Sequence, residues 1–420
     1  MSEKDEMTID ERRKYLHKMW GRYRLATKKG KSRILDEIEQ VTGLHRKSII
    51  KILNGRLSRK KRTTERGPTY GTDVANAVLR ISKALDHPCV ERLKPNLVFI
   101  GKHMMSHQQI SIDEDMVKKL EAVSNSTLKR MLANTNKLKE KIAKKRFPKR
   151  KRNSFKEAYP MRKIPYDIPE PGHFEVDLVL HCDEDNSGEY IHTIQMTDVA
   201  TGWSEIQAVF GRSYRVMKDG FDCILINLPF PVIEIHPDNG SEFFNHHLLR
   251  FWDNKVPELD VSRSRPYHKN DNRFVEENNA SLVRAYVGHG RLDTLEHLSI
   301  LRRLYVDLCV YHNFFLPVMK TVQKVYIDEF HYRRVFDQAI PPLDRLAKSD
   351  VLSEDQLEVL FSFRDQVDIL ALRQRIDENI ENLWKVKNPK QIIPVNIFDT
   401  LRKEKDLSVT FSFEPTIPVR

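Results

Sequence analysis

The sequence predicts a multidomain protein with an all-α N-terminal region, an α/β core and a mainly helical C-terminal region. Three observations support this fold class. The chain has 420 residues, too many for one ordinary hydrophobic core. Apolar residues recur at helical spacing on both sides of residues 171–290, which instead hold short runs of β-forming residues. The formal net charge of +12 predicts a polyanionic partner, nucleic acid first.

Composition argues against several other classes of protein. Hydrophobic residues make up 40% and charged residues 31% of the chain, as in a soluble globular protein. No run of 18 apolar residues occurs and residues 1–6 do not resemble a signal peptide, so we expect a cytoplasmic protein without a membrane partner. The cysteines Cys89, Cys182, Cys223 and Cys309 form no CxxC pair, which argues against a disulfide framework and a Cys-based zinc site.

Residues 1–66 are predicted to form a helix-turn-helix DNA-binding domain. Ser32 can cap a helix with Ile34 and Ile38 on its apolar face, Gly43 makes the turn, and residues 45–54 form a second helix with a basic outer face. The alternative is a two-helix hairpin whose basic face is merely solvated; the basic run that follows directly favours DNA binding. The residues expected to contact DNA are Arg46, Lys47, Lys51, Arg59, Lys60, Lys61 and Arg62.

Residues 67–133 are predicted to form a second helical DNA-binding unit. Residues 74–85 have a helical apolar pattern, and residues 113–132 repeat the helix-turn-helix rhythm, with Ser126 or Thr127 as the cap of the second helix. Two such units in tandem would read a longer DNA site than either could alone. The outward basic residues expected to contact DNA here are Lys129 and Arg130.

Residues 134–170 are predicted to be a basic linker. Between Lys137 and Lys163 there are 13 Lys or Arg against two Glu, a net charge of +11. Such a run is often only a solvated face or a disordered arm. Because it lies between a predicted DNA-reading module and the α/β core, we expect it to follow DNA phosphates, with an affinity that falls steeply with salt. The residues expected to contact DNA are Lys144, Lys145, Arg146, Lys149, Arg150, Lys151 and Arg152.

Residues 171–290 are predicted to form the α/β domain. The expected strands are 173–180, 190–197, 203–210, 232–236 and 259–261, and the expected helices are 214–227, 245–252 and 273–287. Three antiparallel strands followed by alternating helix and strand is the order of the ribonuclease H-like fold. In that order Asp177 on the first strand, Asp238 at the end of the fourth and a carboxylate on the last helix can converge.

Asp238 allows two interpretations. It follows a β-branched run and enters a turn at Gly240, and carboxylates at the C-terminal ends of strands often carry the chemistry of α/β folds. Alternatively, it is a turn aspartate that binds its own backbone. Two strand-end carboxylates and one helical carboxylate suit a two-metal site, since Mg²⁺ prefers oxygen ligands. No Ser or Cys lies in a motif that would make it the nucleophile.

Five motifs follow one another in residues 171–290. They are GHFEVD at 172–177, TDVATGW at 197–203, DNGSEF at 238–243, SRPYHKNDN at 264–272 and VEEN at 275–278. In this order they resemble the catalytic core of DDE transposases and retroviral-type integrases, and most closely bacterial insertion-sequence transposases with an integrase core. The resemblance implies a catalytic and metal-binding triad of Asp177, Asp238 and Glu276, and two Mg²⁺ or Mn²⁺ ions as cofactor. It also implies a homo-oligomer on double-stranded transposon-end and target DNA in a bacterial nucleoid.

The third acid must be chosen between Glu276 and Glu277, which lie about 100° apart around a helix. Glu276 shares its face with Ala280, Val283 and Val287, a stripe expected to pack inward, and the family's glutamate matches its position. Other polar residues have structural explanations. Asp198 is expected to close a strand-end turn, Glu242 to lie at a helix start, Asp271 to cap a loop and His236 to be a packed neighbour of Asp238.

Residues 291–420 are predicted to be mainly helical, with helices at 295–311 and 352–386.

From the domains and motifs above, the whole chain is predicted to be a DNA transposase that cuts and joins DNA without a covalent protein intermediate. One alternative is a domesticated, non-catalytic DNA-binding regulator. Another is a ribonuclease H-like nuclease that cuts DNA and does not join it; only a transposase would join a pre-cut end to a target.

Overall fold

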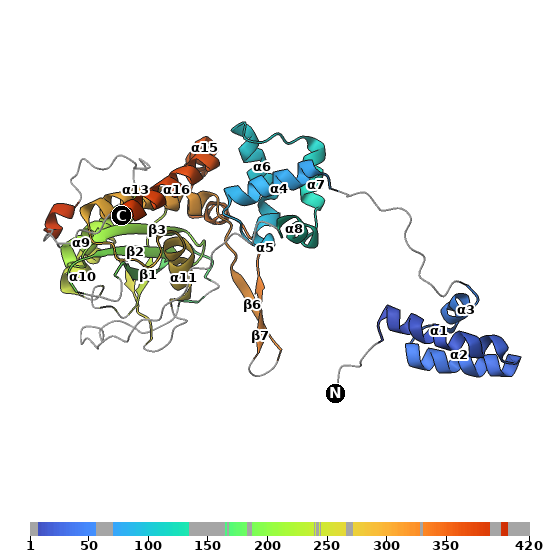
Figure 1. Cartoon of the computed structure of the whole chain (residues 1–420). Coiled ribbons are helices and arrows are strands. Elements are labelled where there is room, and N and C mark those ends of the chain that lie inside the picture. Colours follow the sequence, from blue (N-terminus) through green and yellow to red (C-terminus); the bar gives the residue numbers. More distant parts are fainter. Residues whose placement is uncertain are drawn as a thin grey trace. The chain divides into compact units, whose positions relative to one another are not determined.

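The structure is a computed structural model that describes residues 7–55, 70–133, 164–165, 168–182, 187–238, 240, 243, 245–265, 272–327, 331–386 and 396–401 (Figure 1). The chain divides into two compact units, Met1–Thr69 and Tyr70–Arg420, and each has its own buried apolar cluster. The predicted DNA-contacting residues at 59–62 and 144–152, together with Glu242 and Asp271, lie outside the described residues. Among the described residues, no helix is both long and apolar enough to cross a membrane.

The first unit contains the helix, glycine turn and helix that the sequence predicts. Its helices are α1 (Ile9–Leu25), α2 (Lys28–Thr42) and α3 (Arg46–Leu53). Leu16, Ile38 and Ile49 meet in its core without exposed surface. Gly43 ends α2 with a positive φ of 67°, a conformation that glycine adopts without a Cβ penalty. The turn therefore redirects the chain within three residues.

The start of α2 corrects the predicted cap. Thr27, not Ser32, caps the helix, because its side chain accepts a hydrogen bond from the N–H of Gly30. Ser32 therefore lies inside α2, where its Oγ accepts a hydrogen bond of 2.7 Å from the Arg46 guanidinium. Arg46 also forms an ion pair with Asp36. This predicted DNA-contacting residue thus joins α2 to the first turn of α3.

A group of five helices begins the second unit. They are α4 (Thr72–Ala84), α5 (Val90–Leu93), α6 (Leu97–Ser106), α7 (Glu114–Ala122) and α8 (Asn125–Leu132). The predicted caps Ser126 and Thr127 are wrong: Ser124 caps α8 by accepting from the N–H of Thr127 at 3.2 Å. These helices belong to the same compact unit as the core, and Tyr311 joins the two by donating to the Ala84 carbonyl at 2.7 Å.

A five-stranded mixed sheet forms the centre of the second unit (Figure 1). Its strands are β1 (His173–Leu180), β2 (Ile191–Asp198), β3 (Ser204–Phe210), β4 (Glu234–Pro237) and β5 (Asp260–Val261). The order is β3-β2-β1-β4-β5; β1 and β3 are antiparallel to β2, β4 is parallel to β1, and β5 is parallel to β4. This mixed α/β core is consistent with the predicted ribonuclease H-like fold.

Helices cover both faces of the sheet. The helices are α9 (Tyr214–Asn227), α10 (His246–Lys255), α11 (Arg273–Asn278), α12 (Ala285–Val287) and α13 (Leu295–Phe314). Gly220 brings α9 close to the face that carries Ile194, since a Cβ there would lie 2.5 Å from the Ile194 Cδ1. On the opposite face, the Tyr305 hydroxyl of α13 is hydrogen-bonded to the Thr193 hydroxyl at 2.6 Å. The sheet is thus the middle layer of three.

The C-terminal region departs from the prediction in two places. The elements after α13 are β6 (Thr321–Tyr326), β7 (Tyr332–Phe336), α14 (Pro342–Leu346), α15 (Glu354–Gln366), α16 (Ile369–Lys385) and the 3₁₀ turn η5 (Ile397–Thr400). The β6–β7 hairpin was not predicted. The single helix expected over residues 352–386 is two helices, because the Asp368 side chain caps α16 through the N–H groups of Leu370 and Ala371.

Candidate active site

The parallel ladder between β1 and β4 brings two predicted acids together. Val176 lies opposite Pro237 at the last pair of this ladder. The next residues along the two chains are Asp177 and Asp238, so these occupy neighbouring positions and continue the alternation toward the same face of the sheet. Both are half-buried. The structure thus places the two aspartates side by side at the end of the ladder.

Hydrogen bonds to the local backbone orient both aspartates. One Asp177 carboxylate oxygen accepts from the N–H of Leu178 at 2.8 Å, and the other accepts from the side-chain amide of Asn279. Asp238 accepts from the N–H of Gly240 at 2.7 Å. The turn interpretation of Asp238 is therefore confirmed, and this turn orients the Asp238 carboxylate.

The two faces of the sheet differ in polarity. Along β1, apolar Phe174, Val176 and Leu178 alternate with Glu175 and Asp177. The polar residues of β4 and of the segment after β5 follow the same alternation: Glu234 and His236 on β4, Ser262 and Ser264 beyond β5. Parallel strands that are covered on both faces are usually apolar on both. The polar face is the one that carries the predicted acids.

Glu175 attaches α11 to this polar face. Its side chain has no exposed surface, and one carboxylate oxygen accepts from the N–H groups of Phe274 at 2.6 Å and Val275 at 3.0 Å. These N–H groups lie in the first turn of α11, where a helix has no partners of its own for them. Burial raises the pKa of Glu175 to about 7, against the lowering effect of these hydrogen bonds and of Arg273. β1 therefore holds the start of the helix that carries Glu276.

Glu276 is on α11 but does not lie on the buried stripe predicted for it. Glu276 and Ala280 are exposed, whereas Val283 and Val287 are buried. The physical reason is a π-helical segment over Asn279–Arg284, which widens the turn and shifts the later residues around the axis. The side chain of Glu277 lies outside the described residues.

The predicted acids offer carboxylate oxygens, which suit a hard divalent cation, and two of the three acids are adjacent. Carboxylate oxygens are the ligands that Mg²⁺ prefers, and Asp177 and Asp238 supply them from neighbouring strands. Within the described residues, no three His, Cys, Asp or Glu side chains are grouped so that they could hold one metal ion. The structure therefore brings together Asp177 and Asp238, and leaves Glu276 exposed on the adjoining helix.

A buried chain of polar residues also links β4 to the segment after β5. Glu234 bridges His173 at 2.8 Å and the Ser262 hydroxyl at 2.6 Å. The hydrogen bond with Glu234 raises the pKa of His173, although burial opposes this. Because Ser262 directly follows β5, these contacts fix the start of the segment that returns to α11.

His236 continues this chain, in a role that the sequence did not predict. Its ring lies 2.6 Å from the Ser262 hydroxyl and 3.3 Å from the Ser264 hydroxyl. Ser264 in turn donates to the Asn272 side chain at 2.8 Å, and Asn272 directly precedes α11. His236 is therefore more than a packed neighbour of Asp238. The sequence did contain a signal for this contact: the polar residues Ser262 and Ser264 alternate with the same period as Glu234 and His236 on β4.

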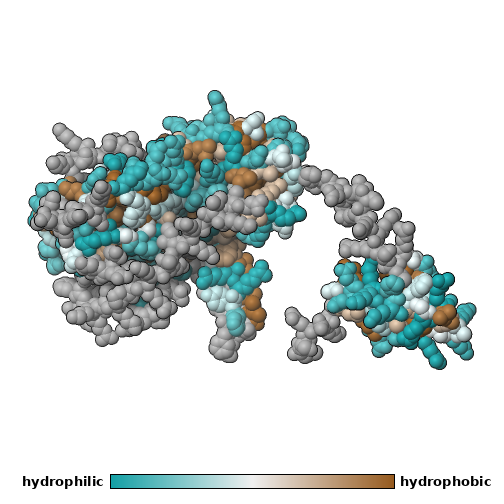
Figure 2. Space-filling view, viewed as in Figure 1, coloured by the Kyte–Doolittle hydropathy of each residue, from teal (hydrophilic) through white to brown (hydrophobic). Residues whose placement is uncertain are grey.

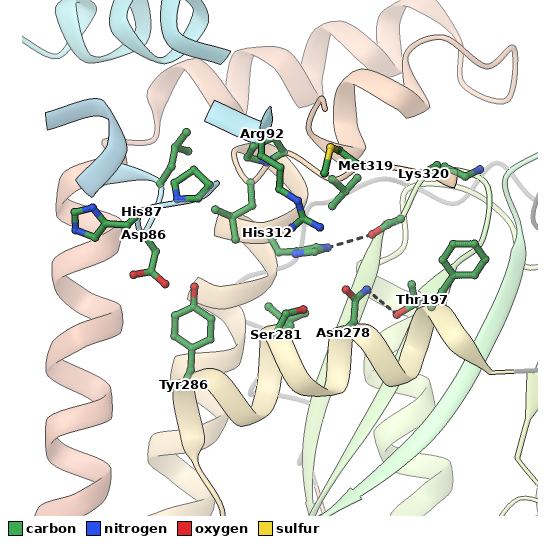
Figure 3. Close-up of a pocket in the computed structure, with 18 of the residues that line it drawn as sticks. Asp86, His87, Arg92, Thr197, Asn278, Ser281, Tyr286, His312, Met319 and Lys320 are labelled. Atoms are coloured by element: carbon green, nitrogen blue, oxygen red, sulfur yellow. Dashed lines mark hydrogen bonds between the residues drawn. The ribbon is translucent and has the colours of Figure 1, made fainter. Parts of the chain in front are cut away.

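A cavity of about 290 Å³ borders the other flank of α11, where Phe274 and Asn278 form part of its wall (Figure 3). Asn278 points toward Thr197 and donates to its hydroxyl at 3.3 Å (Figure 3). The turn between α4 and α5 contributes Asp86 and His87, both with positive φ. Neither predicted aspartate lines this cavity, so it is separate from the candidate active site.

The described DNA-contacting candidates lie on helix surfaces. Lys47 and Lys51 are exposed on α3, and Lys129 and Arg130 are exposed on α8. The Lys129 ammonium forms an ion pair of 2.9 Å with Glu91. Asp198, for which a structural role was expected, has one: its carboxylate accepts from the N–H and the hydroxyl of Thr201 and from the N–H of Gly172, and these hydrogen bonds close the end of β2.

Comparisons with known proteins found a curated relative and similar solved structures. No protein-family model matches the chain. One solved structure is the crystal structure of the catalytic core domain of BIV integrase, whose sequence is 15% identical to this one. The aligned residues cover 34% of this chain and 83% of the integrase chain, with a TM-score of 0.26, and a score this low identifies no shared function. The uncharacterized protein y4rM of Sinorhizobium fredii (strain NBRC 101917 / NGR234) is 32% identical over 325 residues, which span 77% of this chain and 91% of y4rM. The chain therefore belongs to the same family as y4rM.

Proposed function

We propose that this protein is a metal-dependent polynucleotidyl transferase, and specifically a DNA transposase that cuts transposon ends and joins them to target DNA. The observation that carries the proposal is the position of Asp177 and Asp238, side by side at the end of a parallel ladder. Glu175 attaches the start of α11 to the same face of the sheet. A site built on strands and a tethered helix suits chemistry that depends on positioning.

Asp177, Asp238 and Glu276 would hold two Mg²⁺ or Mn²⁺ ions. When bound, such ions activate an attacking oxygen and stabilise a leaving oxygen in an in-line phosphoryl displacement. The chain's own residues orient the ligands: the Asn279 amide fixes one oxygen of Asp177, and the N–H of Gly240 fixes one oxygen of Asp238. Glu276 is exposed on α11, the helix that Glu175 attaches to this face of the sheet.

The reaction would need no protein nucleophile. Water first attacks the phosphodiester at the transposon end; the leaving group is the 3′-oxygen of the transposon strand, which becomes the freed 3′-hydroxyl, and the phosphate stays on the 5′ end of the flanking strand. That hydroxyl then attacks a target phosphodiester; one phosphodiester bond forms as another breaks, and no energy source is required. Double-stranded DNA would be bound by the helices of the first unit, where Lys47 and Lys51 are exposed, and by α8. The protein would act as a homo-oligomer on its DNA.

A strand-transfer assay with Asp238→Asn and Asp177→Asn tests the proposal. The substrate is a pre-cut duplex of the element's own terminal repeat, with a plasmid as target and Mg²⁺ present. We expect each variant to lose about three orders of magnitude in rate, since a metal ion contributes several kcal/mol to the transition state and 1.36 kcal/mol is tenfold. Asp253→Asn, an exposed aspartate on α10, is the matched control and should keep wild-type activity.

Three outcomes separate the proposal from its alternatives. Joined product that depends on both aspartates supports a transposase. Cleavage of an intact end without joining of the pre-cut end indicates a nuclease. Salt-sensitive DNA binding with neither reaction indicates a non-catalytic regulator. If Asp238→Asn joined DNA at the wild-type rate, the assignment of this site would be wrong.

A further inference from the structure

The β6–β7 hairpin projects from the second unit as an arm (Figure 1). Its two strands are antiparallel, with Val325 opposite Arg333 and Tyr326 opposite Tyr332, and the register shifts between Thr321 and Gln323. No strand of the central sheet pairs with either of them. An isolated two-stranded hairpin is only marginally stable in water. The arm therefore needs further stabilisation at its base or from a partner.

The base of the arm is firmly held. The Asp337 carboxylate accepts from the N–H of Lys320 at 2.7 Å and forms an ion pair with Arg345 at 2.5 Å. The same guanidinium donates to the Val318 carbonyl at 2.8 Å. Val318 also forms a β-bridge with Ile340, next to the base of the two strands. The arm is thus fixed in direction by its base, while its outer part extends into solvent.

The surface of the arm is both apolar and basic. Figure 2 shows hydrophobic residues along one side of it. Val322, Val325, Tyr332 and Phe336 are 41–53% exposed, and Ile327 is 73% exposed. His331, Arg333 and Arg334 are exposed too. Among the described residues of the two strands there is no Asp or Glu, and Asp328 and Glu329 lie outside the described residues.

The strand alternation sorts these residues onto two faces. Tyr332, Arg334 and Phe336 share one face, and the Arg334 guanidinium lies 5.9 Å from the centre of the Tyr332 ring. Arg333 lies on the other face beside Val325. Arginine and aromatic groups that alternate on a narrow ribbon provide phosphate contacts and flat stacking surfaces together. The aromatic side chains and Arg334 therefore lie on one face of the ribbon, and Arg333 and Val325 lie on the other.

We infer that the arm binds duplex DNA, with Arg333 and Arg334 on phosphates and the apolar side chains in the groove. The major groove admits a two-stranded ribbon. A second copy of the chain is the competing occupant, but a symmetric contact would bring the same arginines of both copies together, and like charges in contact repel. The inference rests on the proposed function only in taking DNA as the substrate.

The salt dependence of DNA binding by the full-length protein tests the inference. Binding to a random-sequence duplex is measured in EDTA between 50 and 200 mM salt for wild type, Arg333→Ala and Arg334→Ala. Each variant should flatten the slope of log affinity against log salt by about 0.9, because one phosphate contact is lost. Arg334→Lys keeps the charge and should keep the slope. Tyr332→Ala should weaken binding without changing the slope, because its ring carries no charge.

Arg303→Ala, which removes an exposed arginine from α13, is the matched control and should leave the slope unchanged. If Arg333→Ala and Arg334→Ala behave like this control, the arm does not bind DNA. A change in oligomeric mass by light scattering with an unchanged slope would assign the arm to a second copy, and would also overturn the inference. Binding in EDTA requires no catalysis, so a flattened slope in a protein that never joins DNA would refute the proposed function alone.

Discussion

Replacement of Glu175 by alanine should loosen α11 from the sheet. The change removes the carboxylate oxygen that accepts from the N–H groups of Phe274 and Val275, at 2.6 and 3.0 Å. A buried group left without a partner costs about 1–3 kcal/mol, so two such groups cost about 2–6 kcal/mol. We therefore expect a loss of that size in the free energy of unfolding of the second unit. Strand transfer should fall with it, because α11 carries Glu276.

Glu175→Gln separates a positioning role from other causes. Its amide oxygen can accept the same two hydrogen bonds, so stability and strand transfer should return close to the wild-type level. Stability is measured by urea unfolding and the site by the pre-cut end assay with the same protein preparations. Equal stability of Glu175→Ala and wild type would refute the reasoning, because the two N–H groups would then not depend on the carboxylate. Failure of Glu175→Gln to restore joining would show that the negative charge, rather than the tether, matters.

Two further predictions concern the core. Burial raises the pKa of Glu205 to about 7, so between about pH 4.5 and 7 this carboxyl is protonated in the folded state and ionised in the unfolded state, and the free energy of unfolding falls as pH rises through this window. Glu205→Gln should therefore be more stable than wild type at pH 8, by up to about 3 kcal/mol in urea unfolding, and equally stable at pH 4. Glu358→Gln on the surface of α15 is the control and should show no difference at either pH. Gly220→Ala should lower the thermal unfolding temperature, because the added Cβ would lie 2.5 Å from the Ile194 Cδ1. Such overpacking costs about 1–3 kcal/mol, whereas alanine gains about 1 kcal/mol in helix propensity. Gly21→Ala in α1 is the control and should not lower the unfolding temperature, because a Cβ there meets nothing within 4 Å.

Periodicity was sufficient to predict the central strands and the acid at the end of β4. The alternation of β1 and the runs before and after the turn at Gly202 are local properties of the sequence, and β1, β2 and β3 lie within a residue of the predicted bounds. Helix α9 has the predicted bounds as well. The adjacency of Asp177 and Asp238 was expected from the strand order, since a parallel β1–β4 pair places the residue after β4 beside the middle of β1.

Features that depend on tertiary contacts were not predictable in this way. The π-helical segment of Asn279–Arg284 is bounded by two long-range hydrogen bonds, from Asn279 to Asp177 and from Arg284 to the Leu180 carbonyl. A 3.6-residue period cannot reveal such an insertion, and for this reason the stripe predicted for Glu276 was wrong. The β6–β7 arm was missed for a different reason, because its strands are exposed on both faces and lack the apolar–polar alternation of a half-buried strand.

The polar face of the sheet is a costly arrangement for stability alone. Glu175, Glu234 and His236 are 0–3% exposed, and well-packed apolar residues at such positions are often at least as stable as buried charges. The opposite face shows the apolar alternative on the same strands, with Val176 and Ile235 packed beneath α9 and α10. Stability alone therefore does not explain the polar layer. Its hydrogen bonds lead from β1 and β4 to the start of α11, so what they fix is the first turn of the helix that carries Glu276.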